Sequence, residues 1–166
     1  AKLLEGLQNL RFVLIGGGTE EQKIRTLVRK QSLSNTLVLP WQPVDDIKYS
    51  LASADCHIVS QDIGLAGISV PSKTFTALAV GAVIIGIAPH ESQINEIIEK
   101  YHCGILIPPR SSRELANAVQ MLYSNPGRCK EMGSHSRLAA ESEFNTENCT
   151  RKYVDLFNSF RALNNG

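Results

Sequence analysis

The sequence lacks a charge imbalance of either sign, because 17 Lys and Arg residues face 16 Asp and Glu residues and the formal net charge is only +1. This balance removes the usual electrostatic reason to expect nucleic acid as a partner. No uninterrupted apolar run reaches the ~20 residues that a transmembrane helix needs, and the N-terminal residues do not resemble a signal peptide. We therefore expect a cytoplasmic protein.

Closely spaced metal-binding residues are also absent. Neither the cysteines nor three of the histidines have metal-ligand spacing, and no Cys-x-x-Cys pair occurs. These spacings argue against a zinc site, and a chain of 166 residues does not need a disulfide framework. We expect a reducing compartment, no metal site and no cofactor. The residues concerned are Cys56, Cys103, Cys129, Cys149, His57, His102 and His135.

The sequence does contain a regular alternation of short apolar runs and amphipathic segments. The apolar runs predict buried strands at 12–15, 37–39, 57–59, 83–85 and 105–107. Apolar residues at helical spacing predict helices at 20–30, 47–54, 72–80 and 93–101, and three more that start near Ser111, Pro126 and Asn145. This alternation indicates an α/β fold, a Rossmann-like parallel sheet with helices on both faces, in a single domain over residues 1–166.

Polar residues just before several of these helices predict side-chain caps. Thr19 with Gln22, and Ser111 with Glu114, have the spacing of a capping box. Ser72 and Ser92 are the expected N-caps of the helices that follow them. These caps define which backbone N–H groups at each helix start are left without a helical partner.

The first candidate binding segment is the turn Gly16–Gly17–Gly18, which links a strand to a helix. Glycines let the backbone approach a ligand closely, and helix N-termini attract phosphate. An ordinary tight turn explains the same residues equally well. A dinucleotide site also needs an acidic residue about 20 residues further on, and residues 36–41 contain none. This absence argues against a nicotinamide or flavin enzyme.

The second candidate is the helix start at Ser72, Lys73 and Thr74, directly after Pro71. The N–H groups of Lys73, Thr74 and Phe75 are expected to lack helical partners, so that an anion can accept their hydrogen bonds. Lys73 adds a full positive charge, and a diphosphate fits this arrangement. By spacing alone, an ordinary capped helix with a solvated lysine is the more common explanation.

Two further segments follow strands and contain groups suited to a nucleoside. Trp41, in the sequence Trp41–Gln42–Pro43, can cover a base or pack on the protein. Glu91 and Ser92 can meet a ribose or sugar, although a helix start capped by Ser92 is the slightly more common explanation. Since ligands of such sheets bind beyond the carboxyl ends of the strands, both segments belong to the expected ligand edge. The residues alone do not identify a catalytic group.

Taken in order, these segments resemble the C-terminal domain of the retaining GT-B glycosyltransferases of family 4, in the bacterial branch that makes capsule, O-antigen and exopolysaccharide. The resemblance covers almost the whole chain. It is carried by residues 12–18 (FVLIGGG), 52–55 (ASAD), 70–85 (VPSKTFTALAVGAVII), 94–98 (INEII), 103–109 (CGILIPP) and 114–116 (ELA).

The resemblance implies roles for the candidate residues. Ser72, Lys73 and Thr74 would bind the donor diphosphate, the glycine turn would lie near the phosphates and sugar, and the Trp41–Gln42–Pro43 loop would lie near the base. Ile68 and Thr76 stand where many family members carry the two glutamates of an E-x7-E motif. Thr76 is kept as a candidate at the ribose, and without these carboxylates Glu91 and Ser92 are the expected substitutes for holding it.

A larger departure from the family is at the front of the chain. Family members open this domain with another strand and a loop that bears a basic pair, whereas residues 1–7 here read as the following helix. In the usual strand order, 3-2-1-4-5-6, the missing strand is central. An unfilled gap there would cost hydrogen bonds and buried surface, so we expect either an excerpt of a longer chain or a rearranged sheet, and favour the excerpt.

The resemblance implies transfer of a sugar from a nucleoside-diphosphate sugar, with UDP-sugar as the expected donor, to a saccharide or lipid-linked acceptor with retention. The expected partners are the nucleotide sugar, that acceptor and the N-terminal GT-B domain of the same enzyme, with peripheral association at the inner face of the membrane. The isolated fragment is expected to be inactive. Two alternatives remain, a sugar-nucleotide 2-epimerase and a degenerate, non-catalytic domain that binds a nucleotide or a partner protein.

Overall fold

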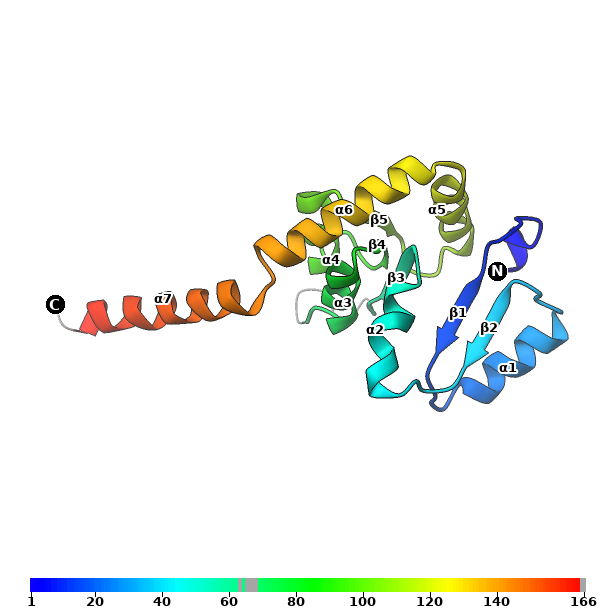
Figure 1. The fold of residues 1–166 in the computed structure, drawn as a ribbon, viewed down its shortest axis with the longest axis horizontal. Helices are drawn as coiled ribbons and strands as arrows, with labels where there is room; N and C mark the ends of the chain where they lie inside the picture. Colours follow the sequence, from blue (N-terminus) through cyan, green and yellow to red (C-terminus); the bar gives the residue numbers. More distant parts are fainter. Residues whose placement is uncertain (63, 65–68, 165–166) are drawn as a thin grey trace.

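The computed structural model describes residues 1–62, 64 and 69–164. Its strands and helices alternate, as the sequence predicts (Figure 1). In chain order the elements are the 3-10 helix η1 (Lys2–Leu4), then β1 (Phe12–Ile15), α1 (Glu21–Lys30), β2 (Thr36–Leu39), α2 (Val44–Ala52), β3 (Cys56–Ser60), α3 (Ser72–Val80), β4 (Val83–Ile87), α4 (Gln93–Tyr101), β5 (Gly104–Ile107), α5 (Ser112–Ser124), α6 (Pro126–Ser142) and α7 (Thr146–Asn164).

The strand pairs of the described residues are all parallel, which confirms the predicted α/β class. The strands form two sheets, one of β1 and β2 and one in the order β3-β4-β5. The register pairs Phe12 with Thr36 in the first sheet, and Cys56 with Val83 in the second. Parallel neighbours need a crossover connection, and helices supply it here between successive strands.

The described strands do not form one continuous sheet, because pairing stops between β1 and β3. Within the described residues, β1 pairs with β2 alone and β3 pairs with β4 alone, so neither has a partner on its other edge. Figure 1 shows β1 between β2 and β3. The described strands therefore form two separate parallel sheets, with no backbone pairing between β1 and β3.

The core lies around β4, whose side chains alternate between the two faces of the sheet. Ile84 packs in one buried cluster with Leu78 of α3 and Ile94 of α4. Val83 and Ile85 point to the other face and pack with residues of η1, α5 and α6. Since helices cover both faces, β4 is fully apolar instead of alternating with polar residues, as its sequence VIIGI indicates.

The β1–α1–β2 unit is much less buried than this core. On β1, Val13, Leu14 and Ile15 keep 49%, 41% and 42% of their surface exposed, and α1 has no buried residue. The unit packs on the rest of the domain through Phe12 at the start of β1, and η1 before it contributes Leu4 to the same cluster on the α5 side. Its apolar strands therefore lack the second covering layer that β4 has.

Several predicted helix starts are wrong. Helix α1 begins at Glu21 with Glu20 as N-cap and no side-chain cap, so Thr19 does not form a capping box. Helix α3 has Pro71 as its N-cap, which makes Ser72 the first helical residue instead of the cap. Ser111 is the N-cap of α5 but makes no side-chain cap bond.

The starts of α4 and α2 can also be compared with their predictions. The Ser92 cap of α4 is confirmed, because its side chain accepts a hydrogen bond of 3.2 Å from the Asn95 N–H. Helix α2 begins at Val44 instead of at residue 47. Pro43 can precede a helix, and the acidic residues Asp45 and Asp46 suit the first turn because they complement the helix dipole.

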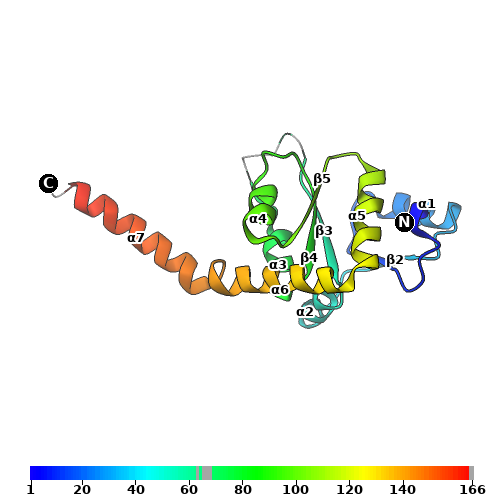
Figure 2. The ribbon, with the colours of Figure 1, turned by 90° about the horizontal axis from the view of Figure 1, so that it is seen from above.

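Helices α6 and α7 form a long arm along and beyond the domain (Figure 2). Helix α6 packs closely on the end of α3, since a Cβ atom added to Gly133 would lie 2.5 Å from the Gly81 carbonyl oxygen. Helix α7 continues away from the sheet and leaves Tyr153, Phe157 and Phe160 exposed. None of the helices in the described part of the chain is both long and apolar enough to cross a membrane.

Candidate functional site

The predicted site residues follow the carboxyl ends of the strands, the edge at which doubly wound sheets bind ligands. The glycine turn follows β1, the Trp41 loop follows β2, and the Glu91 segment follows β4. The start of α3 comes after β3 and a connecting segment that is described only in part. Ile68, where the family's first glutamate would stand, lies outside the described residues.

The glycine turn and Trp41 come together in the structure. Gly16 has φ 129°, a conformation that favours glycine. A Cβ atom added to Gly16 would lie 3.5 Å from the Trp41 ring, and one added to Gly17 would lie 3.1 Å from its Nε1 atom. The indole therefore lies against the turn, while 74% of the Trp41 surface stays exposed. A planar ligand can stack on this open surface.

The rest of the Trp41 loop bonds within itself. The Gln42 side chain donates a hydrogen bond of 3.0 Å to the Pro40 carbonyl oxygen, and Pro43 is the N-cap of α2 and fixes where the loop ends. Two cations of α1, the helix after the glycine turn, are already paired with glutamates. Lys23 pairs with Glu20 and Arg25 with Glu21, each at 2.8 Å between nitrogen and oxygen.

The start of α3 offers a positive charge with no competing carboxylate among the described residues. Ser72 and Lys73 are exposed, and within the described residues no carboxylate lies in ion-pair range of the Lys73 amine. The prediction that the Thr74 N–H is unpartnered is wrong, because this group donates a hydrogen bond of 2.9 Å to the Pro71 carbonyl oxygen. Such a bond across three residues tightens the first turn of the helix.

Two threonines of α3 differ in their surroundings. The Thr74 side chain is fully buried, and its hydroxyl oxygen has no hydrogen-bond partner among the described residues. Thr76 is exposed, and its hydroxyl donates a hydrogen bond of 2.9 Å to the Lys73 carbonyl oxygen. Thr76 therefore bonds within its own helix, while the Thr74 hydroxyl is a buried polar group that no described residue bonds.

Glu91 and Ser92 are neighbours with opposite exposure. The Ser92 side chain is fully buried and caps α4, so its oxygen is already in use. Glu91 is exposed just before that cap. Of the two residues, only Glu91 presents its polar group to solvent.

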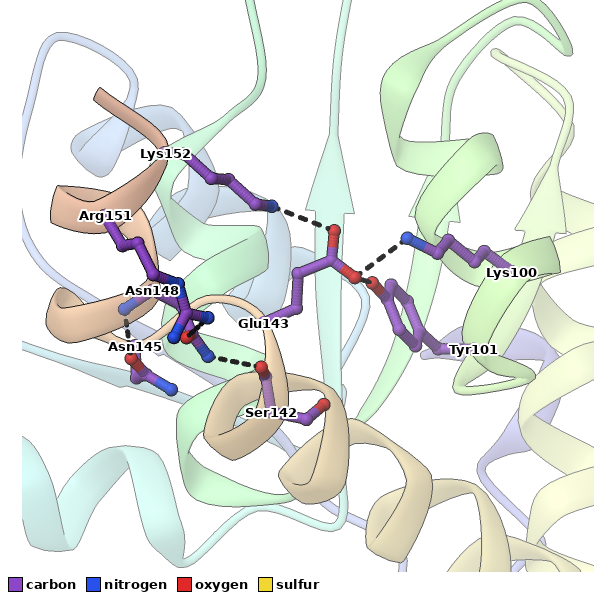
Figure 3. Close-up of polar contacts among 8 residues, drawn as sticks. All are labelled: Lys100, Tyr101, Ser142, Glu143, Asn145, Asn148, Arg151 and Lys152. Carbon is purple, nitrogen blue, oxygen red and sulfur yellow. Dashed lines mark hydrogen bonds and ion pairs between the residues drawn. The ribbon is translucent and has the colours of Figure 1, made fainter. Parts of the chain in front are cut away.

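A polar cluster around Glu143 does not follow from the sequence analysis (Figure 3). The Glu143 carboxylate accepts hydrogen bonds from Lys100 at 2.8 Å and from the Tyr101 hydroxyl, and a further bond from Lys152 at 3.2 Å. The Lys100 bond is the main reason that the pKa of Glu143 falls to about 2. The cluster joins α4, the end of α6 and α7. No sequence pattern links residues that lie 43 positions apart.

Next to the Glu143 cluster, aromatic rings pack between α4, the end of α6 and the start of α3; we call this region the α4–α6 corner. The Phe144 ring lies 5.2 Å from the ring of Phe75 and 5.7 Å from that of Tyr101, between ring centres. Such tilted contacts add to the stability that burial provides. The α4–α6 corner thus holds the helix that carries Lys73 against α4 and the end of α6.

The cysteines are free thiols, and burial makes two of them poor nucleophiles. Burial raises the pKa of Cys56 to about 12 and that of Cys103 to about 11. A thiol with so high a pKa carries little thiolate at neutral pH. Within the described part of the chain, no group of three or more His, Cys, Asp or Glu residues is placed to hold a metal ion.

Comparison with known proteins places this fold in a family. The family model described as "Glycosyl transferases group 1" matches residues 1–139. WcaI of Escherichia coli (strain K12), whose name describes a colanic acid biosynthesis glycosyl transferase, is 24% identical over 147 residues, with 88% of this chain and 35% of that protein covered. EpsD of Bacillus subtilis (strain 168), also named as a glycosyltransferase, is 27% identical over 170 residues, with 98% and 41% covered.

A solved structure shows the same fold. The crystal structure of Anabaena Alr3699/HepE in complex with UDP-glucose matches with a TM-score of 0.75 at 16% identity, and covers 95% of this chain and 43% of that one. Among the sequence relatives, the chain spans only 35% of the length of WcaI and 41% of that of EpsD. The match to the family model over most of its residues shows that this chain belongs to the group 1 glycosyl transferases.

Proposed function

We propose that this chain is the donor-binding C-terminal domain of a retaining family 4 enzyme with the GT-B fold, and that it holds a UDP-sugar by its diphosphate at the start of α3. The observation that carries the proposal is the exposed Lys73 in the first turn of this helix, which no carboxylate of the described residues pairs. A helix N-terminus and an ammonium group both favour a negatively charged ligand. The UDP-glucose complex of the fold neighbour supports the choice of ligand.

In this proposal, the other candidate residues contact the remaining parts of the donor. The turn Gly16–Gly17–Gly18 provides a close backbone approach, and the exposed surface of Trp41 receives the base by stacking. Glu91 replaces the E-x7-E carboxylates in holding the ribose, since Thr76 has no charge and bonds within its helix.

The proposed chemistry is transfer of the sugar to a saccharide or lipid-linked acceptor with retained configuration. As the bond to the sugar breaks, negative charge grows on the leaving diphosphate. Lys73 and the N–H groups of the first turn of α3 stabilise that charge. The acceptor site belongs to the N-terminal domain of the full-length enzyme, which would work in the cytoplasm at the inner face of the membrane.

Calorimetric titration of the chain with UDP tests the site. We expect binding by the natural sequence and binding about tenfold or more weaker in Lys73→Ala, because a charged partner of the phosphates is lost. Lys130→Ala removes an exposed lysine of α6 and serves as the matched control, with unchanged affinity. Uridine should bind more weakly than UDP. No heat of binding up to about 1 mM UDP, or equal affinity in the Lys73 and Lys130 variants, contradicts the proposal.

A further inference from the structure

A cavity lies at the ligand edge of the sheet, beyond the carboxyl ends of β4 and β5. It has a volume of about 480 Å³ and opens between α4 and the residues that follow β4 and β5. The candidate donor-binding residues are not among those that line it. Its lining includes three polar residues, His90, Asn95 and Glu99, and three apolar ones, Leu106, Pro108 and Pro109.

Asn95 gives this cavity a fixed polar group. Its side chain is 4% exposed, and its amide nitrogen donates hydrogen bonds of 3.0 Å to the His90 carbonyl oxygen and to Glu99 Oε1. Both donors of the amide are thereby used, which fixes its orientation. Within the described residues no donor bonds to its amide oxygen, so an acceptor remains for a ligand.

Among the described residues that line the cavity, Glu99 is the one carboxylate, and its negative charge disfavours a phosphate ligand. The Glu99 carboxylate lies at the rim, with Oε1 held by Asn95 and 3.6 Å from His90 Nε2. Its other oxygen and the Asn95 amide oxygen are both acceptors, which suit hydroxyl donors. A nearby carboxylate repels a diphosphate, whereas it forms strong hydrogen bonds with neutral hydroxyl groups.

We infer that this cavity binds a neutral, unphosphorylated sugar ring. The ring hydroxyls donate to Asn95 and Glu99, and the apolar face of the ring packs against Leu106, Pro108 and Pro109. The volume lies within the range of small-molecule sites. The inference does not depend on the diphosphate site, because the two sites share no residue. The sugar can belong to a saccharide substrate or be the sugar of the donor, and competition with UDP-sugar separates these sources.

Two-dimensional NMR titrations with glucose, galactose and mannose test the inference. We expect saturable shifts at His90, Asn95 and Glu99 for at least one sugar, with a Kd on the order of millimolar for so small a ligand. Glu99→Gln should weaken binding about fivefold or more, because a charged acceptor becomes neutral. Glu96→Gln changes an exposed carboxylate on the same helix that does not line the cavity, and should leave the affinity unchanged.

Competition with UDP and UDP-glucose, and a titration with a small cation, complete the test. UDP should not displace the sugar, while displacement by UDP-glucose but not by UDP identifies the donor sugar as the occupant. The inference is overturned if no sugar gives saturable shifts, if the two glutamate variants behave alike, or if UDP displaces the sugar. It is also overturned if methylammonium binds there and the sugars do not. The sugar titrations and the two glutamate variants do not require UDP binding at Lys73, so the two proposals can fail separately.

Discussion

Strands β1 and β4 have similar sequences and opposite surroundings. Both are short apolar runs, FVLI and VIIGI, yet Val83 and Ile84 of β4 are fully buried while Val13, Leu14 and Ile15 of β1 are nearly half exposed. Strand β4 has a hydrogen-bonded neighbour on each edge and helices on both faces, whereas β1 has one neighbour among the described strands. An apolar run therefore predicts a strand, but the depth of its burial depends on the elements that surround it.

The largest expected difference is in the free energy of unfolding, when one aliphatic residue is replaced in each of the two strands. Ile84→Ala should lower the free energy of unfolding by about 2–5 kcal/mol, because it opens a cavity in a closed core. Leu14→Ala should cost about 1 kcal/mol, since much of that side chain is already exposed. Urea denaturation followed by circular dichroism measures both. Equal losses would show that β1 is as well packed as β4 in solution.

The contact between α3 and α6 shows how little free space the β4 region has. Gly133→Ala should destabilise the protein by about 1–3 kcal/mol, because the new methyl group would press on the Gly81 backbone. Gly127→Ala, on the same helix and with nothing within 4 Å of the added Cβ, should cause no loss and gain up to about 1 kcal/mol. Thermal unfolding of both variants is the measurement. A harmless Gly133→Ala would mean that the two helices move apart easily.

The smallest expected effect on stability is at Glu143, between α6 and α7. The pKa of Glu143 is lowered to about 2 from 4.5, so its contribution to stability is present above pH 4.5 and is lost as the pH falls toward 2. Glu143→Gln should slightly lower the unfolding temperature at neutral pH, with a difference from the natural sequence that shrinks as the solution is acidified. Glu141→Gln, in the last turn of α6, removes an exposed ion pair with Arg137 and is the control. A difference that stays constant throughout the acid range would exclude this ionic origin.

Local sequence patterns predict the alternation of elements, the α/β class and the Ser92 cap, because each depends on neighbouring residues. The predicted caps at Thr19 and Ser72 are wrong because the N-caps of those helices lie one residue away, at Glu20 and Pro71. The start of α3 is a candidate site from its sequence, but the burial of Thr74 is not predictable in this way. That burial depends on how α3 packs against distant segments. The contact between the Trp41 loop and the glycine turn likewise depends on tertiary structure, since it joins the segments that follow β1 and β2.

The open edges of β1 and β3 have a practical consequence for handling this chain. Each edge presents backbone N–H and C=O groups that no strand in the described residues pairs, and exposed aliphatic side chains flank them on β1. Such edges are templates on which other chains can add strands. Concentrated preparations should therefore self-associate edge to edge, and dilute samples should be used when its ligands are measured.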